Sequence, residues 1–419
     1  MFAVYFYLLT LLIAPQLWLP PFVGVPVDFI AFPLLLVMVF VSGRLLQFLR
    51  LTVHDLFFAG FVAWMTLSSV INGFSDLSRD AIEFYLKLFL LYKLVATLLT
   101  DFTRVRRFMI VFTAMVLLLG IEVVYHRFSP DGKGWAGQTF SWIDPSVVAA
   151  GGKGRARWVG IFDGPGVFAV LFAIVLPFTL QLLGREYAKG KRILGALSLA
   201  LVLVATYFIG SRGGLVATLG VIVLHAMIRI GVAPKTIILA SIGCLCVYSV
   251  MPSYLTTVRD QSNSTQYRIE MWAEGLDMIK EHPIIGIGRG NFQAYTGKLI
   301  AHNSAVEIMG ETGLVGLFLW VALIYVSIKS ILAVRAERAD PRDKAFCTSM
   351  MLAIVGYIIS AMFVTLEYET FYLLIAMCSA LGRIAPQPIA LVRRDYRTIG
   401  TIIGAALVAL QVFVIVYLG

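Results

Sequence analysis

The sequence predicts an all-α, polytopic integral membrane protein. Hydrophobic residues make up 59% of its 419 positions and charged residues only 14%, whereas soluble domains carry about 25% charged residues. Apolar runs of the length that a helix needs to cross a bilayer recur along the chain. Backbone polar groups cannot remain unpaired in lipid, so each run is expected to be helical.

Candidate spans can be placed in order along a single membrane domain that covers residues 1–419, and we expect 12 or 13 of them to cross the membrane. They lie at 2–19, 27–42, 54–72, 81–99, 107–125, 165–183, 193–209, 213–229, 235–251, 313–333, 345–364, 369–384 and 399–418. No basic region or small-residue cleavage site marks the first span as a removable signal, so we expect it to be retained. The cysteines all fall inside apolar runs without further metal ligands nearby, which predicts small buried side chains and no metal site.

Charge orients these spans. With the N-terminus in the cytoplasm, 20 of the 34 Lys and Arg residues fall in cytoplasmic loops, and the short outer loops carry only Arg79 and Arg212. This bias follows the positive-inside rule, and long loops cross regardless of charge. Two long outer loops, 126–164 and 252–312, hold ten more basic residues. An outer surface rich in arginine suits a polyanionic ligand such as a pyrophosphate.

The loop at 252–312 has a helical pattern of its own. Between Thr265 and His282 apolar residues recur at helical spacing opposite an acidic face. Pro283 ends this amphipathic helix, which we expect to lie along the bilayer surface. The glycine-rich turn at 286–291 follows; it is no dinucleotide fingerprint, because the strand before it is missing.

A histidine marks the end of this loop. Asn303 is a good N-cap for a helix that starts near Ser304, which places His302 just outside a helix N-terminus, where an anion is favoured. Glu307 and Glu311 share one face of that helix. They either orient His302 or form a solvated helix face.

Several arginines are candidate anion ligands. Arg212 lies in the short hairpin Ser-Arg-Gly-Gly, where it either faces a polar cavity or anchors to lipid phosphate. Arg268 either binds an anion or forms a surface salt bridge. Arg157 and Arg289 are either anion ligands or plain loop charges.

Short motifs occur in a characteristic order over residues 80–385. They are Arg-x-x-Gly-x-Phe-x-x-Pro at 157–165, Ser-Arg-Gly-Gly at 211–214, Gln-Tyr-Arg at 266–268, His-Pro-Ile-Ile-Gly-Ile-Gly at 282–288, His-Asn at 302–303 and Glu-Thr-Gly-Leu-Val-Gly at 311–316. Together they resemble the O-antigen ligase and polymerase superfamily. One departure is Gly166 after the proline, where relatives often carry Asn.

The resemblance implies a glycosyltransferase of the bacterial inner membrane with periplasmic catalytic loops. Such enzymes take a glycan from undecaprenyl pyrophosphate without a metal or other cofactor. Ligases pass it to the lipid A core, and polymerases pass it to a second carrier-linked glycan. The pyrophosphate-binding arginines of the family map onto Arg212, Arg268 and Arg157, and its histidine maps onto His302.

The expected chemistry is direct displacement with inversion. His302 is the expected base, because an imidazole has an ordinary pKa of about 6.5. Arg212 and Arg268 are the expected catalytic cations, with Arg157 and Arg289 as further pyrophosphate ligands and Asn303 and Glu307 in support. The positive charge of the chain is assigned to membrane orientation and not to a nucleic-acid partner.

Three other functions compete with that of a ligase. The spacing between Arg268 and His302 favours a ligase over a polymerase. A small-anion transporter fits the number of spans, but transporters often carry internal repeats and hold substrate near the bilayer midplane, whereas here the distinctive residues lie on the outer side. A structural subunit of a secretion complex accounts for neither Arg212 nor His302.

Overall fold

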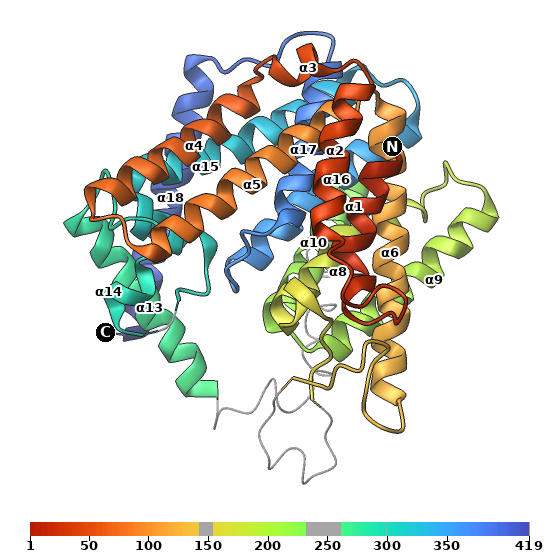
Figure 1. The fold of residues 1–419 in the computed structure, drawn as a ribbon, viewed down its shortest axis with the longest axis horizontal. Helices are drawn as coiled ribbons and strands as arrows, with labels where there is room; N and C mark the ends of the chain where they lie inside the picture. Colours follow the sequence, from red (N-terminus) through yellow and green to blue (C-terminus); the bar gives the residue numbers. More distant parts are fainter. Residues whose placement is uncertain (142–153, 232–260, 299, 419) are drawn as a thin grey trace. The chain divides into compact units, whose positions relative to one another are not determined.

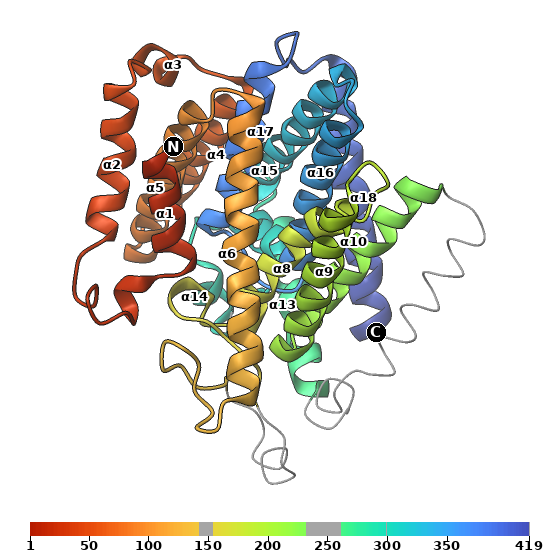
Figure 2. The same ribbon diagram turned by 90° about the vertical axis from the view of Figure 1, so that its right-hand side faces the viewer.

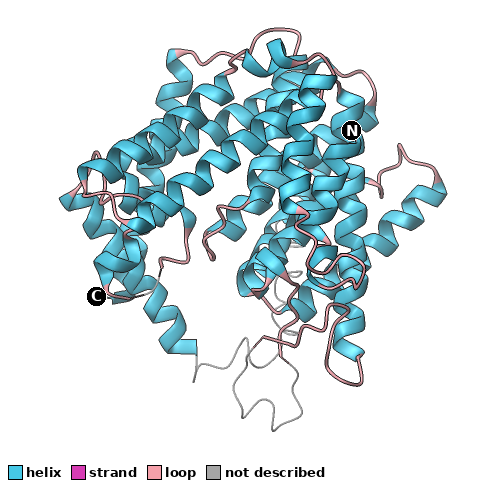
Figure 3. Cartoon of the chain, viewed as in Figure 1, coloured by secondary structure: helices cyan, strands magenta, loops and turns pink. Residues whose placement is uncertain are grey.

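The computed structural model describes residues 1–141, 154–231, 261–298 and 300–418. Within these ranges the chain consists of helices joined by loops and turns (Figure 3), which confirms the predicted all-α fold. The α-helices are α1 (Phe2–Leu12), α2 (Asp28–Val41), α3 (Leu45–Leu49), α4 (Val53–Ile71), α5 (Asp76–Leu98), α6 (Phe102–Phe128), α8 (Pro165–Gln181), α9 (Lys189–Ile209), α10 (Arg212–Ile230), α13 (Gln261–Glu281), α14 (Phe292–Thr296), α15 (Ser304–Glu337), α16 (Pro341–Ala361), α17 (Glu369–Ile384) and α18 (Arg393–Leu418).

The helices are those of a multi-pass membrane protein. Among the described helices, α4, α6, α9, α10, α15, α16 and α18 are long and apolar enough to cross a membrane, and α1, α2 and α8 are apolar but shorter. Every predicted span overlaps a described helix except that at 235–251, which lies outside the described residues. The total of 12 or 13 spans stays a prediction.

The first predicted span, 2–19, was too long. Helix α1 ends at Leu12, and Ala14 then adopts a left-handed backbone with φ of 49°. Pro15, which lacks an N–H and cannot continue an α-helical ladder, starts a short 3-10 turn. The chain therefore leaves the helix seven residues before the end of its apolar run.

Side-chain caps fix several helix starts. Thr52 and Asp55 form a capping box at the start of α4, and the Ser211 hydroxyl accepts the Gly214 N–H at 3.2 Å at the start of α10. Asp340 caps α16, with Pro341 at its first position. Such caps satisfy backbone N–H groups that have no partner inside the helix.

The described helices belong to two compact units, each built from several parts of the chain. The first contains Met1–Leu35, Arg106–Val258 and Arg338–Phe363, and the second contains Leu36–Val105, Arg259–Glu337 and Val364–Gly419. The single membrane domain expected from the sequence stays a prediction.

Helix α8 is the core of the first unit. It packs against α9, α10 and α16 (Figures 1 and 2) and buries nearly all of its side chains. Gly214 of α10 lies so close to Ala169 that an added Cβ would be 2.4 Å from the Ala169 Cβ. Small residues at such positions let membrane helices approach closely.

Helix α15 is the core of the second unit. It packs against α4 and α17, and α13 packs against both α15 and α18. The amphipathic helix expected between Thr265 and His282 corresponds to α13, which ends at Glu281 before Pro283. Its apolar side forms a small buried cluster with Phe292, Ala301 and Val306. This packing joins the 252–312 loop region to the start of α15.

Candidate active site

Helix α15 is broken at Gly313. This glycine has φ of 68° and ψ of −170°, so α15 consists of a short helix from Ser304 and a long one that continues to Glu337. A Cβ at Gly313 would be 2.2 Å from the Ile284 carbonyl oxygen, so both the backbone angle and the space require glycine. The break separates the first turns of α15 from the long apolar span.

The loop after α13 forms hydrogen bonds with backbone groups that have no helical partner because of the break at Gly313. The N–H groups of Ile287 and Gly288 donate to the carbonyls of Gly310 and Glu311 at 3.1 and 2.9 Å. The Trp64 indole donates to the Thr312 carbonyl at 2.8 Å. Hydrogen bonds from the protein therefore satisfy the backbone groups that have no helical partner at the break.

His302 lies one residue before the cap of the short helix, as expected. Its φ is 52°, a left-handed value that is uncommon for a residue other than glycine. Asn303 Oδ1 accepts the N–H groups of Ala305 and Val306 at 3.1 and 3.3 Å, which confirms the predicted cap. The Trp272 indole donates to the Ala301 carbonyl at 3.0 Å and ties this turn to α13.

Arg268 acts electrostatically on His302. It lies on α13 and is half-buried, as is His302. Burial, followed by the positive charge of Arg268, lowers the pKa of His302 below its ordinary value. The imidazole is therefore neutral at pH 7 and able to accept a proton. Two of the predicted site residues, from separate elements, are thus brought together.

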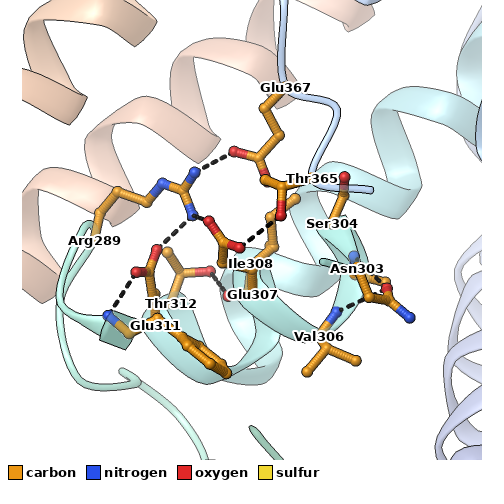
Figure 4. A network of polar contacts seen from close by, with 12 residues as sticks. Arg289, Asn303, Ser304, Val306, Glu307, Ile308, Glu311, Thr312, Thr365 and Glu367 are labelled. Atoms are coloured by element: carbon orange, nitrogen blue, oxygen red, sulfur yellow. Dashed lines mark hydrogen bonds and ion pairs between the residues drawn. The ribbon is translucent and has the colours of Figure 1, made fainter. Parts of the chain in front are cut away.

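Arg289 is the centre of a buried ion cluster (Figure 4). Its Nη1 contacts Glu311 Oε2 and its Nη2 contacts Glu367 Oε2, while Glu307 Oε1 lies 3.9 Å from Nη1. Glu367 also accepts the Tyr85 hydroxyl, and the guanidinium lies over the Tyr85 ring at 5.4 Å. Arg289 is 7% exposed and Glu311 2%.

The cluster joins three segments around the start of α15. Arg289 belongs to the loop after α13, Glu307 and Glu311 belong to the short helix, and Glu367 precedes α17. The Thr365 hydroxyl donates to Glu307 at 2.8 Å, and the Leu366 N–H donates to the Ser304 hydroxyl at 2.9 Å. These contacts hold the turn that carries His302.

This arrangement revises two expectations. Arg289 was expected as a pyrophosphate ligand or a plain loop charge. It is buried and three carboxyl groups surround its guanidinium, so the plain loop charge is wrong, and its role as a pyrophosphate ligand stays a prediction. Glu307 and Glu311 are buried, so the expectation of a solvated helix face is wrong. Glu307 contacts Thr365 and Arg289, which makes it part of the support beneath the His302 turn.

The cluster carries more negative than positive charge. Three carboxyl groups face one guanidinium, which leaves a formal excess of two negative charges in a buried site. Burial raises the pKa of Glu367, an effect that Arg289 opposes. Burial alone would lower the pKa of Arg289, but Glu311 and Glu367 raise it well above its usual range. Arg289 therefore stays charged, while burial favours the protonated form of Glu367.

Sequence reasoning missed Glu367 and Tyr85. Glu367 and Glu369 lie between two apolar runs, and carboxyl groups in such a setting are uncommon unless paired. This signal marks Glu367 as a buried partner but does not identify Arg289, 78 residues earlier, as the cation it binds.

Arg212 and Arg157 belong to the first unit. Arg212 is the first residue of α10, is half-buried, and interacts electrostatically with Arg155. Arg157 forms an ion pair with Asp163 at 2.6 Å and donates to the Thr139 carbonyl at 2.9 Å.

Comparisons with known proteins address the family. Residues 196–321 match the model of a family described as O-Antigen ligase. This segment contains Arg212, Arg268, Arg289, His302, Asn303 and Glu307 but not Arg157. A curated O-antigen ligase of Pseudomonas aeruginosa is 33% identical over 90 residues, which are 20% of this chain and 21% of that ligase. The match thus spans about a fifth of the relative, and both findings confirm the resemblance predicted from the sequence.

Proposed function

We propose that this multi-pass membrane protein belongs to the O-antigen ligase and polymerase superfamily and is a glycosyltransferase that acts on lipid-linked glycans. In this proposal the donor is a glycan on undecaprenyl pyrophosphate, the acceptor is the lipid A core, and the reaction occurs on the periplasmic face of the bacterial inner membrane. The observation that carries it is the neutral His302 beside Arg268, at the capped start of a broken helix, inside the segment that matches O-antigen ligases.

His302 is the proposed general base. An acceptor hydroxyl gives its proton to the imidazole while its oxygen attacks the anomeric carbon of the donor sugar. The bond from this carbon to the phosphate oxygen breaks, and undecaprenyl pyrophosphate leaves with the bonding electrons. One such displacement inverts the anomeric configuration and involves no covalent enzyme intermediate.

Arginines are the proposed partners of the leaving group. Negative charge grows on the pyrophosphate as the bond breaks, and a guanidinium that binds phosphate through two N–H groups stabilises it. We assign this role to Arg212 and Arg268. Arg157 is a further candidate, although it already forms an ion pair with Asp163. Asn303 and Glu307 position the histidine.

The broken helix is also a feature of transporters, which expose freed carbonyls to ions. Here the carbonyls of Gly310, Glu311 and Thr312 accept hydrogen bonds from the protein itself. Each of these carbonyls thus already has a hydrogen-bond donor within the protein, so the break alone does not indicate a site for a coupling cation.

A deletion strain rescued by plasmid tests the function. If the chain is a ligase, the deletion removes all polymer from lipid A while carrier-linked polymer accumulates, as seen on a lipopolysaccharide gel. Core with a single repeat would instead identify a polymerase. Unchanged glycan on both lipids would reject the whole assignment.

A pair of histidine variants tests the base. His302→Ala should fail to restore ligation, whereas His282→Ala, an exposed histidine in the same unit, should restore it fully. Equal membrane levels of the two proteins, measured by immunoblot, serve as the control. Full rescue by His302→Ala would remove the histidine from the mechanism.

A conservative substitution tests whether Arg212 binds the phosphate through two N–H groups. Arg212→Lys keeps the charge but loses the planar pair of donors, so we expect a loss of activity. Arg79→Lys, at an exposed ion pair with Asp76, is the matched control. Wild-type activity of Arg212→Lys would reduce its role to that of a point charge.

A further inference from the structure

A groove lies within the first unit, at the end of α6 where the chain enters that helix. Its volume is about 660 Å³, within the range of about 300–1,000 Å³ typical of small-molecule sites. One face of α6 lines it with Arg106, Ile110 and Thr113, and α9 lines it with Lys191 and Leu194. The end of α8 and the start of α16 complete the wall.

The groove closes toward the other end of α6. At Gly120 an added Cβ would be 3.2 Å from Leu201 of α9 and 3.3 Å from Phe172 of α8. The helices therefore touch there and diverge toward Arg106. Ile110 and Leu194 at the mouth are 59% and 57% exposed. In a helix that crosses a bilayer, such exposed apolar side chains face lipid tails.

One end of this apolar groove is basic. Arg106, Lys191 and Arg342 line it together with a single acid, Asp340, which caps α16 by accepting the Arg342 N–H at 2.8 Å. Arg106 Nη1 lies 3.3 Å from Asp343 Oδ1. Asp343 Oδ2 also lies 3.9 Å from Arg338 Nη1, so the charge of Asp343 is shared between two arginines. Positive charge remains in excess at this end.

The groove also contains a buried polar atom that has no hydrogen-bond partner among the described residues. Thr113 Oγ1 makes no hydrogen bond within the described part of the chain, although it is shielded from solvent. Thr113 lies seven residues beyond Arg106 on the same helix, about 10 Å along its axis. A buried hydroxyl without a partner is costly, and an acceptor on a bound molecule would remove this cost.

We propose that this groove binds an anionic glycerophospholipid. An acyl chain occupies the apolar part, an ester carbonyl accepts the Thr113 hydroxyl, and the phosphate lies among Arg106, Lys191 and Arg342. In the orientation predicted from charge, this lipid belongs to the cytoplasmic leaflet, where basic residues attract anionic headgroups. The site is separate from the residues assigned to glycan transfer and does not depend on that assignment.

Native mass spectrometry of the full-length protein in detergent tests this proposal. The protein is titrated with phosphatidylglycerol or with phosphatidylcholine of the same acyl chains. We expect tighter binding of phosphatidylglycerol, and loss of this binding in Ala114→Phe, which fills the groove from α6. Leu118→Phe, on the same helix but outside the groove, should bind as the wild type does.

A second pair of variants tests the charge. Lys191→Gln should weaken binding of phosphatidylglycerol about fivefold and leave phosphatidylcholine unchanged, whereas Lys189→Gln, exposed on the same helix, should have no effect. Should Ala114→Phe not fold, Thr113→Val probes the groove in its place and should weaken both lipids.

Three results would overturn the proposal. They are equal binding of the two lipids by the wild type, equal effects of the groove variants and their controls, and displacement of the lipid by inorganic phosphate alone. The last result would identify a site for a free anion rather than for a lipid.

Discussion

His302 combines several local features that suit a proton acceptor. The Asn303 cap holds the turn, the left-handed backbone sets its direction, and burial together with Arg268 keeps the imidazole neutral. The role of base proposed for His302 therefore depends on the whole turn and on Arg268, and not on the histidine alone.

The pH dependence of transfer follows from this setting. A base must be neutral, so activity should fall as pH decreases through the pKa of His302, which burial and Arg268 lower below 6.5. We expect the acid limb of kcat/KM for glycan transfer by the purified protein to have its midpoint below pH 6.5. Arg268→Gln removes a repelling charge and should move this midpoint upward, while Arg79→Gln should leave it in place. A wild-type midpoint above 6.5 would contradict the assignment.

Arg289 should matter for stability more than for chemistry. Arg289→Met leaves three carboxyl groups buried without their cation, and breaking a buried ion pair costs about 3–5 kcal/mol. We expect a marked fall in the thermal unfolding midpoint of the purified protein. Arg79→Met, at an exposed pair with Asp76, should cost at most about 1 kcal/mol. Equal midpoints for the two variants would show that the cluster is not a structural support.

The residue scale also shows what the sequence could predict. His302 and Asn303 were identified because a cap and its neighbour are adjacent in the chain. The partners of Arg289 were not, because Glu311 and Glu367 follow it by 22 and 78 residues. Only the folded chain brings these charges together, so the pairing of Arg289 with buried carboxyl groups could not be predicted from the sequence.

At the scale of elements, α15 shows how a local break depends on distant support. The apolar runs located the helices well, because each span must be helical and long enough to cross lipid. The break at Gly313 was not predicted, since a glycine inside a helical pattern is often tolerated. What makes the break stable is the loop at 282–291 together with Ser68 and Trp64 of α4, whose side chains reach the freed carbonyls.

Gly313→Ala tests this element directly. The backbone angles at Gly313 belong to a region that is essentially restricted to glycine, at a cost of about 1–3 kcal/mol for other residues, and the added Cβ would overlap the Ile284 carbonyl. We expect a lower unfolding midpoint and loss of ligation. Gly400→Ala on α18, where no atom lies within 4 Å of the added Cβ, should be neutral or slightly stabilising. A stable and active Gly313→Ala would show that the break is incidental.

At the scale of the whole molecule, the charge pattern of the sequence predicts membrane orientation but not which segments pack together. The distribution of Lys and Arg predicts which loops face the cytoplasm. It does not predict that each compact unit is assembled from three separate parts of the chain. This grouping arises from the packing of α8 and α15 against helices distant in sequence, and hydropathy contains no information about such partners.

The predicted orientation can be tested with single cysteines introduced on the two sides. Cys347 and Cys378 are buried, and replacing all four native cysteines by alanine gives a background without other thiols. A thiol reagent that does not cross membranes should label Lys298→Cys, an exposed site near His302, in cells whose outer membrane alone is permeable. Gln387→Cys, exposed between α17 and α18, should react only after the inner membrane is opened. Because the donor pyrophosphate is proposed to be on the periplasmic face, the opposite labelling would place His302 on the wrong side and exclude it as the base, whatever its local geometry.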